Sequence, residues 1–174
     1  MNEYIDKIKN IELKESIKNM FDYLEKTYNF SDKPAAKTHH HNYRGGLAVH
    51  TSEVCDNALK LNKSWGFFEE DSIIKVALLH DVMKAKSYQF KKYKTNDREY
   101  IDIVSGSCSG EAWVFNLCNK FNVELTESEL SAIEFAHGGW STQAKDFYIK
   151  QSKLSYLLHC ADLLSANFGE VNKK

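Results

Sequence analysis

The sequence lacks most of the features that mark secreted, membrane or zinc-finger proteins. Its four cysteines are scattered and form no Cys-x-x-Cys pair, so we interpret them as reduced thiols rather than a disulfide framework or a zinc finger. No apolar run approaches the roughly 18 residues of a membrane span. The first residues are too polar and acidic for a signal peptide. We therefore expect a soluble, cytoplasmic protein with no membrane partner.

The sequence also lacks an excess of charge of either sign. The 23 Lys and Arg residues nearly cancel the 24 Asp and Glu residues, which leaves a net charge of −1 and no broad basic field for long duplex nucleic acid. The sequence contains no repeat, low-complexity tract or linker. We expect a single domain over residues 1–174, with a covering helical segment at 1–28 and a motif-bearing core at 39–166.

Apolar residues recur at three- and four-residue steps over most of the chain, which predicts an all-α bundle of about six amphipathic helices. Pro34, the only proline, ends the first helical segment. Thr126 and Glu129 have the spacing of a capping box. Between residues 88 and 104, aromatic and polar residues alternate around a turn signal, which predicts a short β-hairpin that could act as a flap. The expected helices cover 1–28 (one helix or two), 45–61, 70–84, 112–121, 126–136 and 151–167.

The helix expected at 70–84 is apolar nearly all round and carries His80 and Asp81 in its last turn. Polar groups at the end of a buried helix require a partner, and a metal ion is a natural one. Imidazole nitrogen together with carboxylate oxygen suits Mn, Fe, Co, Ni or Zn better than Ca or a redox copper site. An adjacent His-Asp pair is weak evidence alone, so further ligands must come from other segments.

Other candidate side chains lie on separate segments. His50 falls among apolar residues of the 45–61 helix, where a lone histidine is more often a hydrogen-bonded core residue than a ligand. His159 and Asp162 are three residues apart and share one face of the last helix. The run of histidines at 39–41 fits either a solvated loop or a polar rim over an active site.

These residues stand in an order that resembles the HD-domain superfamily of metal-dependent phosphohydrolases. The signature of that superfamily is a histidine, then a His-Asp pair, then a distant aspartate, as in His50, His80-Asp81 and Asp162. The resemblance extends from about residue 39 to residue 166 and is closest to a branch common in phages and low-GC bacteria. The segments that carry it are 39–50, 78–85 and 159–162.

The resemblance implies an all-α domain with one divalent transition-metal ion (Mn, Fe, Co, Ni or Zn) in the middle of the bundle. It implies hydrolysis of a phosphate ester or anhydride of a nucleotide. The alternatives are a phosphodiesterase for cyclic or short oligonucleotides and a metal-stabilised binding or signalling module without turnover. Its implied metal ligands are His50, His80, Asp81 and Asp162. Its implied substrate-binding residues are His40, His41, Lys84, Lys86 and His159.

Two of these residues would be catalytic. Asp81 would hold the metal and orient or deprotonate the attacking water. Lys84 corresponds to the superfamily's lysine near the substrate phosphate, and its alternative role is that of a solvated lysine at a helix end. His159 likewise has the alternative of a core histidine.

Two departures from the branch bear on the number of metal ions. Ser109 and Ala136 stand where relatives tend to have histidines, which are expected to hold a second ion in dinuclear members. His137 follows directly, but a shift of one residue on a helix turns a side chain by about 100°. We therefore expect one tightly bound ion. Rescue of a second site by His137, His159 or the histidines at 39–41 is the alternative.

Overall fold

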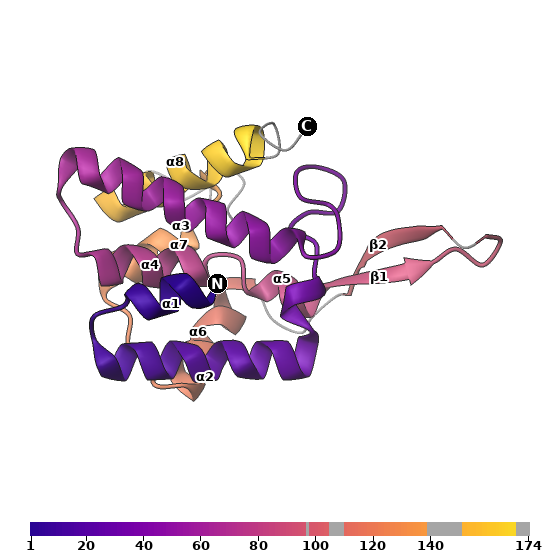
Figure 1. Cartoon of the computed structure of the whole chain (residues 1–174), viewed down its shortest axis with the longest axis horizontal. Helices are drawn as coiled ribbons and strands as arrows, with labels where there is room; N and C mark the ends of the chain where they lie inside the picture. The colour runs from indigo at the N-terminus through magenta and orange to yellow at the C-terminus, as the bar shows by residue number, and fades with distance from the viewer. Residues whose placement is uncertain (97, 105–109, 139–150, 170–174) are drawn as a thin grey trace.

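The computed structural model of the chain describes residues 1–96, 98–104, 110–138 and 151–169. These residues form an all-α fold with one small antiparallel sheet, which confirms the expected fold class (Figure 1). The α-helices are α1 (Asn2–Lys7), α2 (Ile11–Tyr28), α3 (Gly46–Trp65), α4 (Glu70–Leu79), α5 (Met83–Ser87), α6 (Gly110–Lys120), α7 (Glu127–Glu134) and α8 (Lys153–Phe168). A 3₁₀ turn, η1, covers Phe30–Asp32, and the strands are β1 (Tyr88–Lys92) and β2 (Glu99–Ile103).

Two of the expected helices are divided. The first segment breaks after α1, and the Asn10 side chain caps α2 by accepting a hydrogen bond from the Leu13 amide. The segment expected at 70–84 ends its regular helix at Leu79 instead. The Val82 amide then donates to the Leu79 carbonyl, in the i to i+3 pattern of a tighter turn, before α5 begins. His80 and Asp81 therefore lie in a turn between two helices, not inside one.

The core is built around α3 and α4. Helix α3 packs against α8 on one side and α4 on the other, while α7 packs against α8 and α4 (Figure 1). Every residue of α4 from Ile73 to Leu79 is buried, as its all-round apolar sequence predicts. Tyr4, Met20 and Leu24 from the N-terminal helices belong to the same core.

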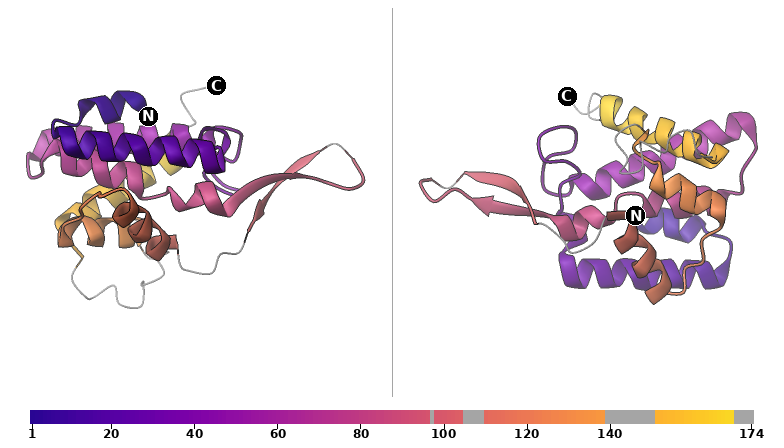
Figure 2. Two further views of the ribbon diagram at one scale, coloured as in Figure 1. Left: turned by 90° about the horizontal axis from the view of Figure 1, so that it is seen from below. Right: turned by 180° about the vertical axis from the view of Figure 1, so that it is seen from behind.

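The β-hairpin projects away from the helical body in all three views (Figures 1 and 2). Its strands pair with Tyr88 opposite Ile103 and Lys92 opposite Glu99. Arg44 fastens the hairpin to the body, because its guanidinium lies over the Phe90 ring and pairs with both Glu99 and Asp32. The predicted hairpin is thus confirmed; its action as a flap stays a prediction.

The capping box predicted from the sequence is present at the start of α7. The Thr126 hydroxyl accepts from the Glu129 amide, and the Glu129 carboxylate accepts from the Thr126 amide. Among the helices that the structure describes, none is both long enough and apolar enough to cross a membrane.

Candidate metal centre

Four side chains from three parts of the fold converge at one point. His50 lies in the first turns of α3, His80 and Asp81 lie in the turn after α4, and Asp162 lies in the middle of α8. Because α3 packs against both α4 and α8, these segments bring the four residues together. His50, His80 and Asp81 are completely buried, and Asp162 is 8% exposed.

The distances between donor atoms are short. His50 Nε2 lies 3.0 Å from Asp162 Oδ1 and 3.4 Å from Asp81 Oδ2. His80 Nε2 lies 3.4 Å from His50 Nε2 and 3.5 Å from Asp81 Oδ2. One donor atom from each of His50, His80 and Asp162 lies within 4.8 Å of the others, close enough for a shared metal ion. Two imidazole nitrogens and two carboxylate oxygens form a ligand set suited to a divalent transition metal.

The hydrogen bonds behind the histidines orient their rings. His80 Nδ1 lies 2.7 Å from the carbonyl oxygen of Ala77, which can only accept a hydrogen bond. Nδ1 of His80 therefore carries the proton, and Nε2 presents its lone pair to the cluster. A ligand histidine bound through one ring nitrogen commonly donates its other N–H in this way.

The electrostatics of the cluster favour a cation. Burial lowers the pKa of His50, but Asp162 and Asp81 outweigh that effect and raise it overall. Burial also raises the pKa of Asp81, yet Lys84 and His80 hold it well below its ordinary value. Burial lowers the pKa of His80 to about 4, so this imidazole is neutral near pH 7. The charged carboxylate of Asp81 and the neutral imidazole of His80 already have the protonation states that metal binding requires, whereas a protonated His50 would release a proton as an ion binds.

One carboxylate oxygen of Asp81 is buried without a hydrogen bond to a described residue. Asp81 Oδ1 is shielded from solvent and makes no hydrogen bond to a described residue, although His137 Nε2 lies 3.2 Å away. A buried carboxylate oxygen without a hydrogen bond is costly unless something else stabilises it. A positive charge is such a group: the protonated His137 imidazole supplies one, and a cation held by the donor set around Asp81 would supply one as well.

His137 lies at the cluster, contrary to the expectation that a shift of one helical position would turn it away. Helix α7 ends at Glu134, so His137 follows a turn and the 100° rotation per helical residue does not apply. Its Nε2 faces Asp81 Oδ1, and its Nδ1 lies 3.3 Å from Asp162 Oδ2. Burial lowers the pKa of His137, but Asp162 and Asp81 outweigh it and raise the pKa to about 10.

The two other positions that bear on a second metal ion are Ala136 and Ser109. Ala136 is buried and has no side-chain donor atom. Ser109 lies outside the described residues. Among the described residues, His137 could support a second ion, and so could the group of His40, His41 and His50, whose donor atoms also lie within 4.8 Å of one another.

The two lysines predicted to face a phosphate point in different directions. Lys84 Nζ lies 2.5 Å from Asp81 Oδ2, directly beside the cluster. Burial lowers the pKa of Lys84, but Asp81 outweighs it and raises the pKa above its ordinary value, so the ammonium stays charged. Lys86 extends over the Trp113 ring, with its Nζ 5.7 Å from the ring centroid. The structure therefore brings Lys84 to the cluster and places Lys86 against α6.

The predicted substrate-binding histidines His40 and His41 differ in how far they are exposed. The His40 ring is partly exposed and lies 4.8 Å from the His50 ring, centroid to centroid, at the edge of the cluster. Burial, with smaller contributions from His50 and Lys84, lowers the pKa of His40 to about 4. His41 is completely buried, and its Nε2 lies 3.0 Å from Glu53 Oε2. Both rings thus contact His50, and the two Nδ1 atoms of His40 and His41 lie 3.2 Å apart, while their roles in substrate binding stay predictions.

His159 supports the turn that carries His137. Its Nδ1 lies 2.8 Å from the Ala136 carbonyl oxygen, and its ring lies against Gly138, which has a left-handed φ of 54°. A Cβ at position 138 would come within 2.5 Å of His159 Nε2, so glycine is required there. The predicted role of His159 in substrate binding stays a prediction.

Sequence reasoning missed two residues behind His50. The Ser165 hydroxyl lies 2.9 Å from His50 Nδ1 and donates a hydrogen bond of 2.8 Å to Glu53 Oε2. Glu53 follows His50 by three residues on α3, and Ser165 follows Asp162 by three on α8. Because residues three apart share a helix face, this spacing was the available signal.

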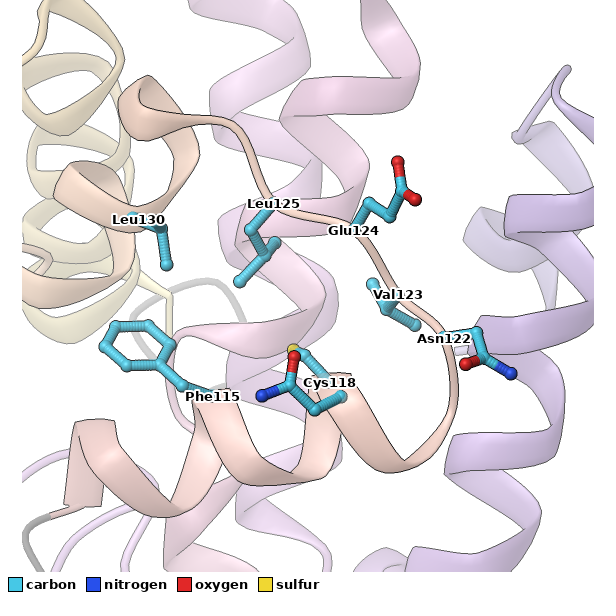
Figure 3. A pocket seen from close by; sticks show the side chains of 8 residues that line it. Phe115, Cys118, Asn122, Val123, Glu124, Leu125 and Leu130 are labelled. Atoms are coloured by element: carbon cyan, nitrogen blue, oxygen red, sulfur yellow. The ribbon is translucent and has the colours of Figure 1, made fainter.

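A separate surface pocket of about 550 Å³ lies between α6 and α7 (Figure 3). Its lining includes Phe115, Cys118, Val123 and Leu130, and it includes none of the candidate site residues. The pocket is therefore distinct from the cluster of His50, His80, Asp81 and Asp162.

The fold and the cluster together define a candidate divalent-metal centre held by three segments of an all-α fold. Over 154 residues, the chain is 33% identical to the dihydroneopterin 2',3'-cyclic phosphate phosphodiesterase of Methanocaldococcus jannaschii. The alignment covers 80% of this chain and 54% of that protein, so the chain spans about half the length of the curated relative it matches. No family model and no solved structure matches the chain.

Proposed function

We propose that the chain is a metal-dependent phosphohydrolase of the HD type. The observation that carries this proposal is the buried cluster of His50, His80, Asp81 and Asp162 with Lys84 beside it. Its order along the sequence is the order of the HD signature. The similarity to a phosphodiesterase supports the same class of reaction.

In this proposal, His50, His80, Asp81 and Asp162 hold one divalent ion. Mn, Fe, Co, Ni and Zn are the candidates, because the donors are imidazole nitrogens and carboxylate oxygens. When bound, such an ion polarises a phosphoryl oxygen and lowers the pKa of a water molecule.

The other chemistry belongs to the side chains around the cluster. In this proposal Asp81 holds the ion and orients or deprotonates the attacking water, since one of its oxygens has no hydrogen bond to a described residue. Lys84 remains protonated and offsets negative charge that develops on the phosphate oxygens. His40, at the edge of the cluster, contacts the ligand. The burial of the ligand side chains keeps bulk water away and strengthens each of these interactions.

Between the activities that the sequence leaves open, we favour cleavage of a phosphodiester in a small cyclic phosphate. The similar archaeal protein is named for a 2',3'-cyclic phosphate substrate. A phosphodiester carries one negative charge, and Lys84 supplies one positive charge beside the cluster. Hydrolysis adds one water across one P–O ester bond and opens the ring to a phosphomonoester.

A substrate screen tests the proposal. The purified chain is incubated with 2',3'-cyclic nucleotides, a pterin cyclic phosphate, 3',5'-cyclic nucleotides, short oligonucleotides and nucleoside mono-, di- and triphosphates. Each is tested with Mn, Mg, Co, Ni and Zn in turn, and products are followed by ³¹P NMR. We expect a metal-dependent phosphomonoester product from a 2',3'-cyclic phosphate. Turnover that persists in excess chelator, or in His80→Ala, would contradict a metal-dependent reaction at this cluster.

A further inference from the structure

A chain of hydrogen bonds runs from His50 to a carboxylate behind it. His50 Nδ1 lies 2.9 Å from Ser165 Oγ, and Ser165 Oγ lies 2.8 Å from Glu53 Oε2. Ser165 is 1% exposed, and the Glu53 side chain is 22% exposed. The same Glu53 oxygen lies 3.0 Å from His41 Nε2. His50 and Glu53 lie on α3, Ser165 lies on α8, and His41 lies in the segment before α3. The hydrogen bonds therefore join distant parts of the chain.

The chemistry of the three groups sets the direction of these bonds. An ionised carboxylate only accepts hydrogen bonds, and a hydroxyl has one proton to donate. Ser165 therefore donates to Glu53 and must accept a hydrogen bond from Nδ1–H of His50. A neutral imidazole with its proton on Nδ1 has its lone pair on Nε2. That is the atom 3.0 Å from Asp162 Oδ1 and 3.4 Å from Asp81 Oδ2.

The two histidines of the cluster differ in how this orientation is secured. His80 needs no relay, because the Ala77 carbonyl can only accept from its Nδ1–H. His50 faces a hydroxyl, which on its own can donate to Nδ1 as readily as accept from it. If Ser165 donated to His50, the imidazole proton would move to Nε2 and block the ligand position. Glu53 removes that alternative by accepting the hydrogen bond that the serine hydroxyl donates.

We propose that Glu53 is a positioning residue that acts through Ser165 to hold His50 in the orientation and tautomer that bind a cation. This inference rests on the proposed function, because it requires a metal ion at the cluster. His41 and Gly169 keep Glu53 in place. His41 provides a second hydrogen bond, and the absence of a side chain at 169 leaves room for the carboxylate, since a Cβ there would come within 1.9 Å of Glu53 Oε2.

The test compares the affinity of the full chain for Co²⁺ in Glu53→Gln, Ser165→Ala and the double variant, by competition with a chelating indicator. The glutamine amide can donate to Ser165 and reverse the relay, while alanine removes it. We expect each single variant to lose about 10- to 100-fold in affinity, the range for groups that hold metal ligands. Because both residues act in one relay, we expect the double variant to bind Co²⁺ no more weakly than whichever single variant binds it more weakly.

A matched control separates the relay from the loss of a charge. Asp56 lies one turn further along α3, and its carboxylate interacts with the Tyr4 hydroxyl instead. Asp56→Asn removes the same charge, and we expect it to keep the wild-type affinity. In the zinc-loaded protein, we also expect the His50 Nδ1–H proton to give a low-field NMR signal that exchanges slowly, and to exchange faster in both single variants.

The outcomes are separable. Wild-type affinity in both single variants, or losses that add in the double variant, would overturn the role of Glu53 and leave the proposed function intact. A wild-type chain that binds no divalent metal would overturn the proposed function itself. Glu53 is partly exposed and glutamine has the same shape, so Glu53→Gln decides the question if Ser165→Ala does not fold.

Discussion

Asp81 and Lys84 form an ion pair of 2.5 Å, and the same carboxylate oxygen lies 3.4 Å from Nε2 of His50. One atom of Asp81 thus faces both a cluster histidine and the lysine beside it. A residue placed in this way connects the group that would hold the metal with the group that would meet the substrate. Its two neighbours should therefore respond differently to mutation.

Loss of a proposed ligand should abolish metal binding and hydrolysis together. In His80→Ala or Asp81→Ala, we expect at least about a 100-fold loss in both, because a buried cation needs its full donor set. Circular dichroism should show nearly unchanged helix content. The exposed His39, replaced by alanine, is the matched control and should bind metal normally. Full turnover in either ligand variant would contradict a reaction at this site.

Loss of Lys84 should separate catalysis from metal binding. We expect Lys84→Ala to reduce kcat by about 10²- to 10³-fold, because a preorganised charge beside the phosphate is removed, with the metal still bound. Lys86→Ala is the comparison: the sequence predicts a substrate contact, but the structure directs this lysine to Trp113, so we expect a smaller effect. Metal content and kcat are measured on the same samples. Equal loss of metal and activity in Lys84→Ala would mean that Lys84 has been misassigned.

The cluster should hold one tightly bound ion. Two cations a few ångströms apart repel strongly, and the four proposed ligands suffice for one. Elemental analysis of protein purified without chelator should give about one equivalent, and His137→Ala should keep it. His137 faces Asp81 and Asp162, so it is positioned to hold a second ion beside them. Two equivalents that fall to one in His137→Ala, with a second anomalous peak beside Asp81, would show a dinuclear centre.

Metal binding should stabilise the fold. A ligand present at 100 times its Kd stabilises the native state by about 2.7 kcal/mol, because it binds the native state and not the unfolded chain. Thermal unfolding of the chain with Mn²⁺ or Co²⁺ should therefore show a raised Tm that reverses with chelator. Asp162→Ala should show no such shift. An equal shift in that variant would place the metal somewhere other than the cluster.

A glycine before His50 should matter for a steric reason. A Cβ at Gly46 would lie 2.0 Å from the His41 carbonyl oxygen, so we expect Gly46→Ala to destabilise the fold by about 3 kcal/mol, the upper range for overpacking. Gly66 ends α3 with φ of 65° and has open space around it, so Gly66→Ala should cost only about 1 kcal/mol. The free energy of unfolding in urea measures both. Equal losses would show that the loop before α3 moves freely.

The sequence by itself determined the helices and the hairpin, because both follow from local periodicity and turn residues. The capping box at Thr126 is local in the same sense, and the structure contains it. The candidate ligands could be named in advance because their order along the chain resembles a known signature. That resemblance also named Lys84, which the structure places beside Asp81.

Only the tertiary structure decided how the side chains around those ligands are aimed. His137 reaches the cluster because α7 ends at Glu134, and one residue more or less of helix would turn its side chain elsewhere. Glu53 and Ser165 are 112 residues apart, and they meet because α3 packs against α8. A serine and a glutamate on helix surfaces have no distinctive local pattern. Their hydrogen bond depends on the distance and rotation between two packed helices, which the sequence of neither helix specifies alone.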